Sequence, residues 1–155
     1  MKLAKIVLFS VATMLASPTI AQTTSDMQIL AEKIKADKKL VVAANMQLTD
    51  EEAKGFWPVY EAYQMDLKTI NQRLAGAVMN YADAYNKGSV ADETAKGLIN
   101  EAIAIEDAEV KLKRTYMPKL EKVLPGMKAA RYIQIEMKIR AIIKYELAAQ
   151  IPLVD

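Results

Sequence analysis

The strongest constraint on the fold is an apolar repeat between Phe56 and Ala84. Apolar side chains recur at alternating spacings of four and three residues over four heptads, at Phe56, Tyr60, Tyr63, Leu67, Ile70, Leu74, Ala77, Tyr81 and Ala84. A period of about 3.5 residues places them on one stripe of an α-helix, which is typical of a coiled-coil seam. No segment shows β-type alternation that competes with this pattern. The sequence therefore predicts an all-α fold with a coiled-coil-like seam.

Capping signals and turns divide the chain into four expected helices. Thr49-Asp50-Glu51-Glu52 has the form of a capping box and opens the helix that carries the repeat. Pro125 can serve as the first residue of the last helix, and Pro152 stops that helix. The expected helices run over residues 25–44, over 50–86, from 89–92 to Pro118 or beyond, and over 125–150.

Two prolines fall inside these predicted helices. Pro58 lacks an N–H and clashes with the carbonyl group of Lys54, so we expect a kink near Lys54 to Trp57 or a helix that restarts there. Pro118 is expected to kink or end the third helix, although Leu120 and Val123 keep the helical phase beyond it.

The third and fourth helices also carry apolar faces, which predict how the helices assemble. In the third helix these are Leu98, Ala102, Ile105, Leu112 and Tyr116, widened by Ile99, Ile103 and Val110; in the fourth they are Tyr132, Ile135, Ile139, Ile142 and Ile143. A helix over residues 50–86 is about 55 Å long at about 1.5 Å per residue, which exceeds the diameter of a compact domain of this size. We therefore expect an elongated helical hairpin or four-helix arrangement, paired as a homodimer.

The first residues, Met1 to Ala21, have the features of an export signal. Two lysines give a basic start, residues 6–16 form a short apolar run, and Thr19-Ile20-Ala21 supplies small residues for a signal peptidase. The apolar run is shorter than the roughly 18 residues that cross a bilayer. We expect cleavage after Ala21, a periplasmic location, and a single helical domain over residues 22–155.

The charge balance argues against nucleic-acid binding. Removing the expected leader takes away two of the 21 basic residues and none of the 19 acidic ones, which leaves 19 of each. Nucleic-acid binding needs a clustered basic face, and the charges here are interspersed. We expect no nucleic-acid partner.

Missing residue types argue against an enzyme. The chain has no histidine and no cysteine, so zinc, copper, haem and thiol chemistry lack their usual ligands and the common general base is absent. Ser25 and Ser89, the two serines beyond the leader, occupy expected helix caps. Residues 83–94 place Gly88 where a calcium loop needs its glycine, but Tyr85 and Lys87 occupy ligand positions and Thr94 replaces the closing glutamate. We expect no catalytic residues, no cofactor and no metal site.

Candidate partner-binding residues have to be weighed against ordinary packing. Trp57 belongs to the one dense aromatic cluster but lies off the seam, so it is the best candidate for a contact with another helix or a partner. Met65 and Met79 join it because methionine suits adaptable surfaces, although filling gaps in a core is the commoner use. The basic groups are either solvated faces or a surface for acidic segments; they are Lys38, Lys39, Lys111, Lys113 and Arg114.

The step from Leu48 and Thr49 to Glu52 at the start of a long helix resembles the Leu-Thr-x-x-Gln motif of the Spy/CpxP-like periplasmic proteins. Leu48 and Thr49 match, and Glu52 stands where the family has glutamine. Both side chains can close a capping box. A second copy of the motif is expected to open the last helix, where Leu124 alone matches.

The resemblance implies a curved dimer of helical hairpins that binds unfolded proteins without ATP or modulates a membrane stress sensor. Neither role needs a catalytic residue. Two alternatives remain open at this stage: a structural or adaptor protein that binds one envelope partner without chaperone action, and a peripheral envelope binder that uses the apolar tail Ile151 to Val154.

Overall fold

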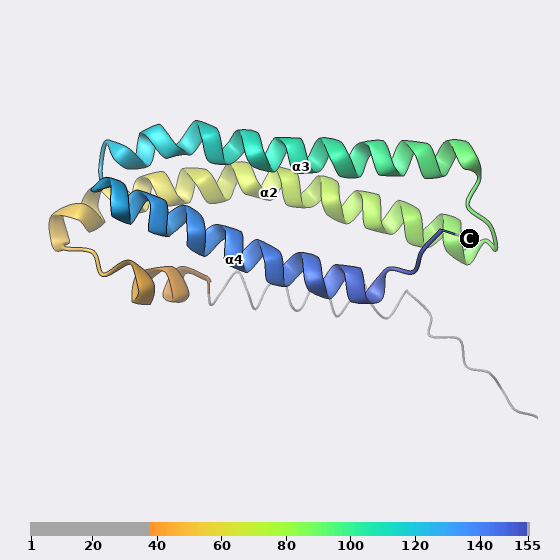
Figure 1. Ribbon diagram of the computed structural model, residues 1–155, viewed down its shortest axis with the longest axis horizontal. Coiled ribbons are helices and arrows are strands. Elements are labelled where there is room, and N and C mark those ends of the chain that lie inside the picture. Colours follow the sequence, from red (N-terminus) through yellow and green to blue (C-terminus); the bar gives the residue numbers. More distant parts are fainter. Residues whose placement is uncertain (1–37, 155) are drawn as a thin grey trace, which may run out of the picture.

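The computed structural model describes residues 38–154 as a set of helices joined by short turns. A helical stretch over residues 38–46 precedes α2 (Asp50–Asn86), α3 (Asp92–Glu121) and α4 (Gly126–Gln150). Within this range no residue is in a strand, so the predicted all-α class is confirmed. Figure 1 shows the long helices lying beside one another along one axis, which makes the molecule elongated. The expected leader and the start of the first expected helix lie outside the described residues.

The capping box that opens α2 is present. The Thr49 hydroxyl accepts a hydrogen bond from the Glu52 N–H at 3.3 Å, and the Thr49 N–H donates to Glu52 Oε2 at 2.8 Å. The helix then runs to Asn86, and Gly88 turns the chain with a φ of 98°, a left-handed value that glycine adopts without steric cost. The predicted bounds of this helix are confirmed.

Neither internal proline interrupts its helix. α2 is continuous through Pro58 and α3 through Pro118, so the predicted restart at Pro58 and the predicted end at Pro118 are wrong. Both prolines are exposed. A carbonyl group deprived of its helical donor on an exposed face can bond to water, which lets packing on the other face keep the helix intact.

The apolar repeat of α2 faces the core. Phe56, Tyr60, Tyr63 and Ile70 are buried, and Leu67, Leu74 and Ala77 pack against them while half-buried. α3 contributes Ile105, Leu112 and Tyr116, and α4 contributes Tyr132 at 0% exposure. These inward positions agree with the sequence pattern.

The apolar faces expected on α3 and α4 are wrong in part. Ile99, Ile103 and Val110 are exposed by 44–58%, and Ile142 by 59%. At about 100° per residue, Ile99, Ile103 and Val110 lie roughly 120–180° around α3 from Ile105 and Leu112, beyond the surface that its neighbours cover. Two glutamates lie inside instead: Glu109 on α3 and Glu136 on α4.

The two ends of the bundle differ in packing. The aromatic end, beside the turn from α3 to α4, gathers six rings that contact one another: Phe56, Trp57, Tyr60, Tyr63, Tyr116 and Tyr132. The tail end comprises residues 71–86 of α2, 92–104 of α3 and 141–154. Over residues 71–104 no side chain is buried, and in 141–154 only Leu147 is.

α4 stands further from α2 than α3 does. α3 packs closely on α2, whereas no Cα of α4 lies within 8 Å of a Cα of α2. Large side chains bridge this space: the Tyr132 ring contacts Phe56 at 5.1 Å and Tyr63 at 5.6 Å between ring centroids. None of the helices described is long and apolar enough to span a bilayer.

Candidate binding surfaces and a buried polar network

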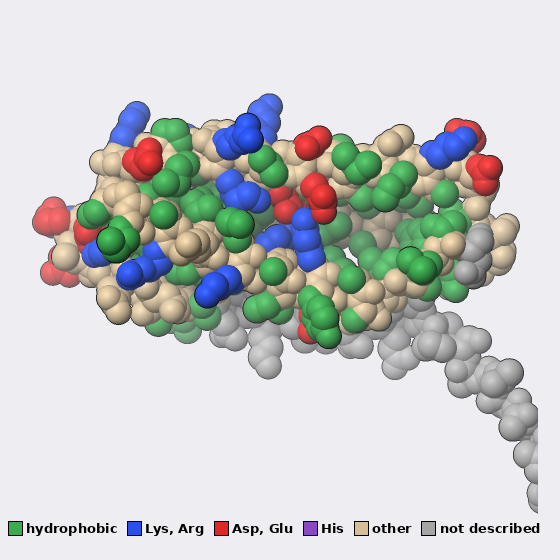
Figure 2. All heavy atoms as spheres, viewed as in Figure 1, with side chains coloured by type: hydrophobic (Ala, Val, Ile, Leu, Met, Phe, Trp, Pro, Cys, Tyr) green, Lys and Arg blue, Asp and Glu red, His purple; other side chains and the backbone are tan. Residues whose placement is uncertain are grey.

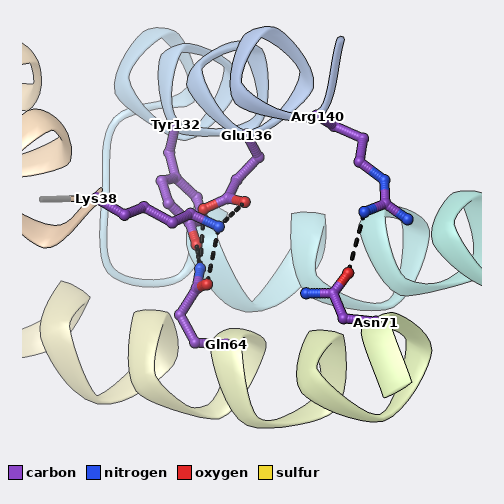
Figure 3. A network of polar contacts seen from close by, with 6 residues as sticks. All are labelled: Lys38, Gln64, Asn71, Tyr132, Glu136 and Arg140. Carbon is purple, nitrogen blue, oxygen red and sulfur yellow. Dashed lines mark hydrogen bonds and ion pairs between the residues drawn. The ribbon is translucent and has the colours of Figure 1, made fainter. Parts of the chain in front are cut away.

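A polar network joins the 38–46 segment to α2 and α4. Lys38 Nζ donates to Glu136 Oε2 at 2.7 Å and to Gln64 Oε1 at 2.8 Å. Gln64 Nε2 donates to Glu136 Oε1 at 2.8 Å and to the Tyr132 hydroxyl at 3.1 Å. Figure 3 shows Lys38 reaching across to meet side chains from both helices. The three polar residues and the tyrosine therefore satisfy one another inside the bundle.

The expectation that Lys38 lies on a solvated face is wrong. Its side chain is 10% exposed and that of Glu136 is 4% exposed. Burying one charge without a partner is costly, so each member of the pair stabilises the other's position. Val42 and Met46 follow on the same segment with no exposed surface, which fixes the segment against the aromatic end.

Lys39 behaves as expected for a surface lysine. It pairs with Glu61 at 3.1 Å while both side chains are more than half exposed. Its ammonium group also lies 5.1 Å from the centre of the Trp57 ring. Exposed pairs of this kind contribute little to the free energy of unfolding.

A second polar cluster lies between α3 and α4. Arg140 donates to Asn71 Oδ1 at 3.0 Å and to Glu109, and Lys144 pairs with Glu106 at 3.0 Å. Arg140 Nε is buried and finds no partner among the described residues. A cavity of about 20 Å³ lies beside this cluster, bordered by Arg140, Glu109 and Glu136 among others, and has room for one water molecule.

Four tyrosines of the aromatic end are held in the neutral form. Burial raises the pKa of Tyr60 to about 12, with the negative charge of Glu136 as the next cause. Burial and the hydrogen bond to Asp66, 2.6 Å between oxygen atoms, raise the pKa of Tyr116 to about 12. Burial also raises the pKa of Tyr63 and of Tyr132 well above the ordinary value.

The buried carboxylates are engaged by cations, which suits a structural role. Glu136 is paired with Lys38, and Glu109 with Arg140 and Lys144. Among residues 38–154, no three histidine, cysteine or acidic side chains are grouped as metal ligands would be. Both buried carboxylates therefore have cationic partners within the bundle.

The motif residues meet at one corner of the molecule. Leu48 packs against the core, while Thr49 and Glu52 cap α2. Glu52 Oε2 also accepts a hydrogen bond from Lys128 Nζ at 2.5 Å, which ties the start of α2 to the first turn of α4. This hydrogen bond is the largest cause of the lowered pKa of Glu52.

The candidate partner residues are not brought together. Trp57 is half-buried, and its ring packs edge-on against Phe56 at 5.0 Å and Tyr60 at 5.3 Å. Met65 and Met79 are exposed by 72% and 53% on the side of α2 opposite the seam. Fourteen residues separate them, or about 21 Å of helix. Trp57 thus contributes to the core, whereas the two methionines are accessible.

The interpretation that methionine side chains fill gaps in the core is correct at some positions and wrong at others. Met46 is fully buried and Met117 packs against the core. Met65, Met79, Met127 and Met137 are exposed by more than half. Met27 lies outside the described residues. The pattern therefore favours the adaptable-surface interpretation for four of the described methionines.

Two exposed apolar surfaces were missed by the sequence reasoning. The α3 stripe consists of Ile99, Ile103 and Val110, which the pattern had assigned to the core. The outer side of α4 exposes Met127, Met137, Ile142 and Tyr145. Figure 2 shows hydrophobic side chains along α3 and a hollow between α3 and the second half of α4. For α4, the even distribution of apolar residues around the helix was the sequence signal that could have predicted exposed apolar side chains.

Comparison with protein-family models, with curated proteins and with solved structures finds no match to this chain.

Proposed function

We propose that this protein is an exported helical binding protein that holds partly unfolded envelope proteins without ATP, as a chaperone. The observation that carries the proposal is the α3 stripe of Ile99, Ile103 and Val110, whose apolar side chains are exposed by 44–58%. Contiguous apolar surface left exposed on a folded domain marks sites of interaction. Unfolded chains present apolar side chains of varied shape, to which such a surface can bind.

The accessible methionines support the same proposal. Met137 borders the α3–α4 cavity, and Met65 and Met79 are separate accessible side chains on the far side of α2. Methionine is unbranched and polarizable, so it adapts to side chains of different shapes. A protein with varied clients benefits from this property more than one with a single fixed partner.

Export, periplasmic location and the homodimer remain part of the proposal. The leader features of Met1 to Ala21 and the likeness of Leu48, Thr49 and Glu52 to the Spy/CpxP motif support the envelope setting. The exposed apolar surface on α3 supports pairing with a second copy.

The test is suppression of aggregation of two unrelated unfolded clients. We expect the wild-type protein to suppress both at severalfold molar excess. The double variant Ile99→Ser and Ile103→Ser should lose most of this effect while keeping most of its helical content, because both side chains are more than half exposed. Leu153→Ser, at an apolar position that is 86% exposed in the tail, serves as the matched control and should behave as wild type.

Failure of the wild-type protein with both clients would refute the chaperone proposal. An adaptor that binds one specific envelope partner, or a modulator of a membrane stress sensor, would then take its place. Equal loss of suppression in Leu153→Ser would show that the α3 stripe is not the binding surface.

A further inference from the structure

The three long helices differ in charge. α4 carries five basic and two acidic residues, whereas α2 carries three basic and six acidic residues and α3 carries five basic and seven acidic residues. Of the two acidic residues of α4, Glu136 is buried and paired with Lys38, and Glu146 is half-buried. Figure 2 shows basic and hydrophobic side chains intermingled along α4, with most acidic side chains elsewhere.

One side of α4 is free of acidic residues over most of its length. The outer α4 stripe recurs at spacings of four and three residues and comprises Met127, Arg131, Gln134, Lys138, Ala141 and Tyr145. All of these are exposed except Arg131, which is half-buried. Ile142, 59% exposed, borders the stripe. The stripe thus combines large apolar side chains with positive charge and spans about 27 Å.

We propose that the outer α4 stripe docks this protein onto the surface of an anionic phospholipid bilayer. A helix that exposes apolar side chains between lysines and arginines lies in the plane of a membrane interface, with the charges on lipid phosphates. Tyr145, 73% exposed, is a residue type enriched at that depth. This proposal goes beyond client binding, which uses the α3 stripe.

The shape and charge of the stripe favour a bilayer over other occupants. The stripe is the outer side of a single helix, so an extended peptide would find no second wall to pack against. A second copy paired through the same stripe would bring Arg131 and Lys138 close to the same residues of its partner, and like charges in proximity repel. An anionic bilayer needs no second wall, and its negative charge attracts Arg131 and Lys138.

The proposal is tested by sedimentation with lipid vesicles. The whole chain is expressed, and the protein is purified after any processing by the cell. It is then mixed with vesicles of phosphatidylcholine alone or with vesicles of phosphatidylcholine and phosphatidylglycerol. We expect binding only to vesicles that contain phosphatidylglycerol, weakened by added salt because charge interactions are screened. The double variant Arg131→Gln and Lys138→Gln should lower the partition coefficient by about thirtyfold.

Two further variants separate docking from general effects. Lys68→Gln with Lys111→Gln removes the same charge from exposed positions of α2 and α3, and should bind vesicles as wild type does. Met127→Ser with Tyr145→Ser should also lower binding, since it removes the apolar part of the stripe. Absence of binding to phosphatidylglycerol vesicles, or an equal loss in the control variant, would overturn the proposal. Aggregation suppression by Arg131→Gln with Lys138→Gln should stay at the wild-type level, which keeps the two proposals distinguishable.

Discussion

At the aromatic end of the bundle six rings contact one another, four tyrosines and a phenylalanine are almost fully buried, and the 38–46 segment closes the side of the core. At the tail end the same helices continue with alanines and half-buried aliphatic side chains, and Leu147 is the one buried residue of residues 141–154. Since both ends are built from regular helices, helix formation alone does not set local stability. The difference lies in how much apolar surface each end removes from water.

The tail end is held by polar contacts at its borders. Arg73 binds Glu101 through two hydrogen bonds of 2.8 and 2.9 Å, and the Tyr81 hydroxyl donates to the carbonyl oxygen of Pro152 at 3.0 Å. Exposed or half-exposed contacts of this kind add little to stability. We infer that the aromatic end carries most of the free energy of unfolding.

High pH gives the largest test, because it acts on four tyrosines of the aromatic end together. The pKa values of Tyr60 and Tyr116 are raised to about 12, from an ordinary value of 10.0. A raised pKa in the folded state means that the stabilisation is complete below pH 10 and is lost as the pH rises through about 12. We expect unfolding in this interval, followed by circular dichroism and tyrosinate absorbance. Tyrosinate formation at the same pH in the native protein and in urea would contradict it.

Truncation of a core side chain should destabilise the protein more at the aromatic end than at the tail end. Phe56→Ala is expected to lower the free energy of unfolding by about 3–5 kcal/mol, because Phe56 has no exposed surface and contacts three other rings. Leu74→Ala, at a half-buried position of the same seam, should cost about half as much or less. Urea denaturation measures both. Equal losses would show that the ends are equally packed.

Charge removal compares two ion pairs of different burial. Glu136→Gln leaves Lys38 buried without its counter-charge and should cost about 3 kcal/mol. Glu101→Gln breaks a pair in which both side chains are 39% exposed, and should cost less than about 1 kcal/mol. Adding Lys38→Met to Glu136→Gln should recover part of the loss. If the two single variants lose the same free energy of unfolding, burial of the Lys38–Glu136 pair does not affect stability.

Two glycines of α2 provide the smallest and most closely matched test. A Cβ at Gly55 would lie 2.9 Å from the Cβ of Val123, whereas a Cβ at Gly76 would meet nothing within 4 Å. Alanine is favoured over glycine in a helix by about 1 kcal/mol. We therefore expect Gly76→Ala to raise the melting temperature and Gly55→Ala to lower it, through a net loss of about 1 kcal/mol. A rise for both would mean that Val123 moves aside freely.

Local signals predicted the helices, whereas the arrangement of the helices was only partly predictable. The Thr49 cap, the seam from Phe56 and the stop at Pro152 each act within one turn or along one face of a helix, and each was found where expected. Ile99, Ile103, Val110 and Ile142 were placed wrongly because their burial depends on where neighbouring helices lie. Period alone cannot tell a covered flank from an open one.

The polar network was missed for a related reason. Glu136 and Lys38 are 98 positions apart, and each resembles an ordinary surface charge in its own helix. Only the packing of α4 against α2 and the 38–46 segment makes them partners. The outer α4 stripe, in contrast, has a signal in the sequence, because apolar residues lie on more than one side of this helix. The sequence pattern was used to predict its inward face only.

Glu52 turns a local helix cap into a long-range constraint. Its hydrogen bond to the Thr49 N–H spans three positions and can form as soon as the first turn of α2 exists, whereas its bond to Lys128 spans 76 positions. The second bond requires that α3 is folded back on α2 and that the first turn of α4 is in place. Glu52 therefore joins the starts of two helices, so that local opening of the start of α2 has to break this long-range bond as well as the capping bonds.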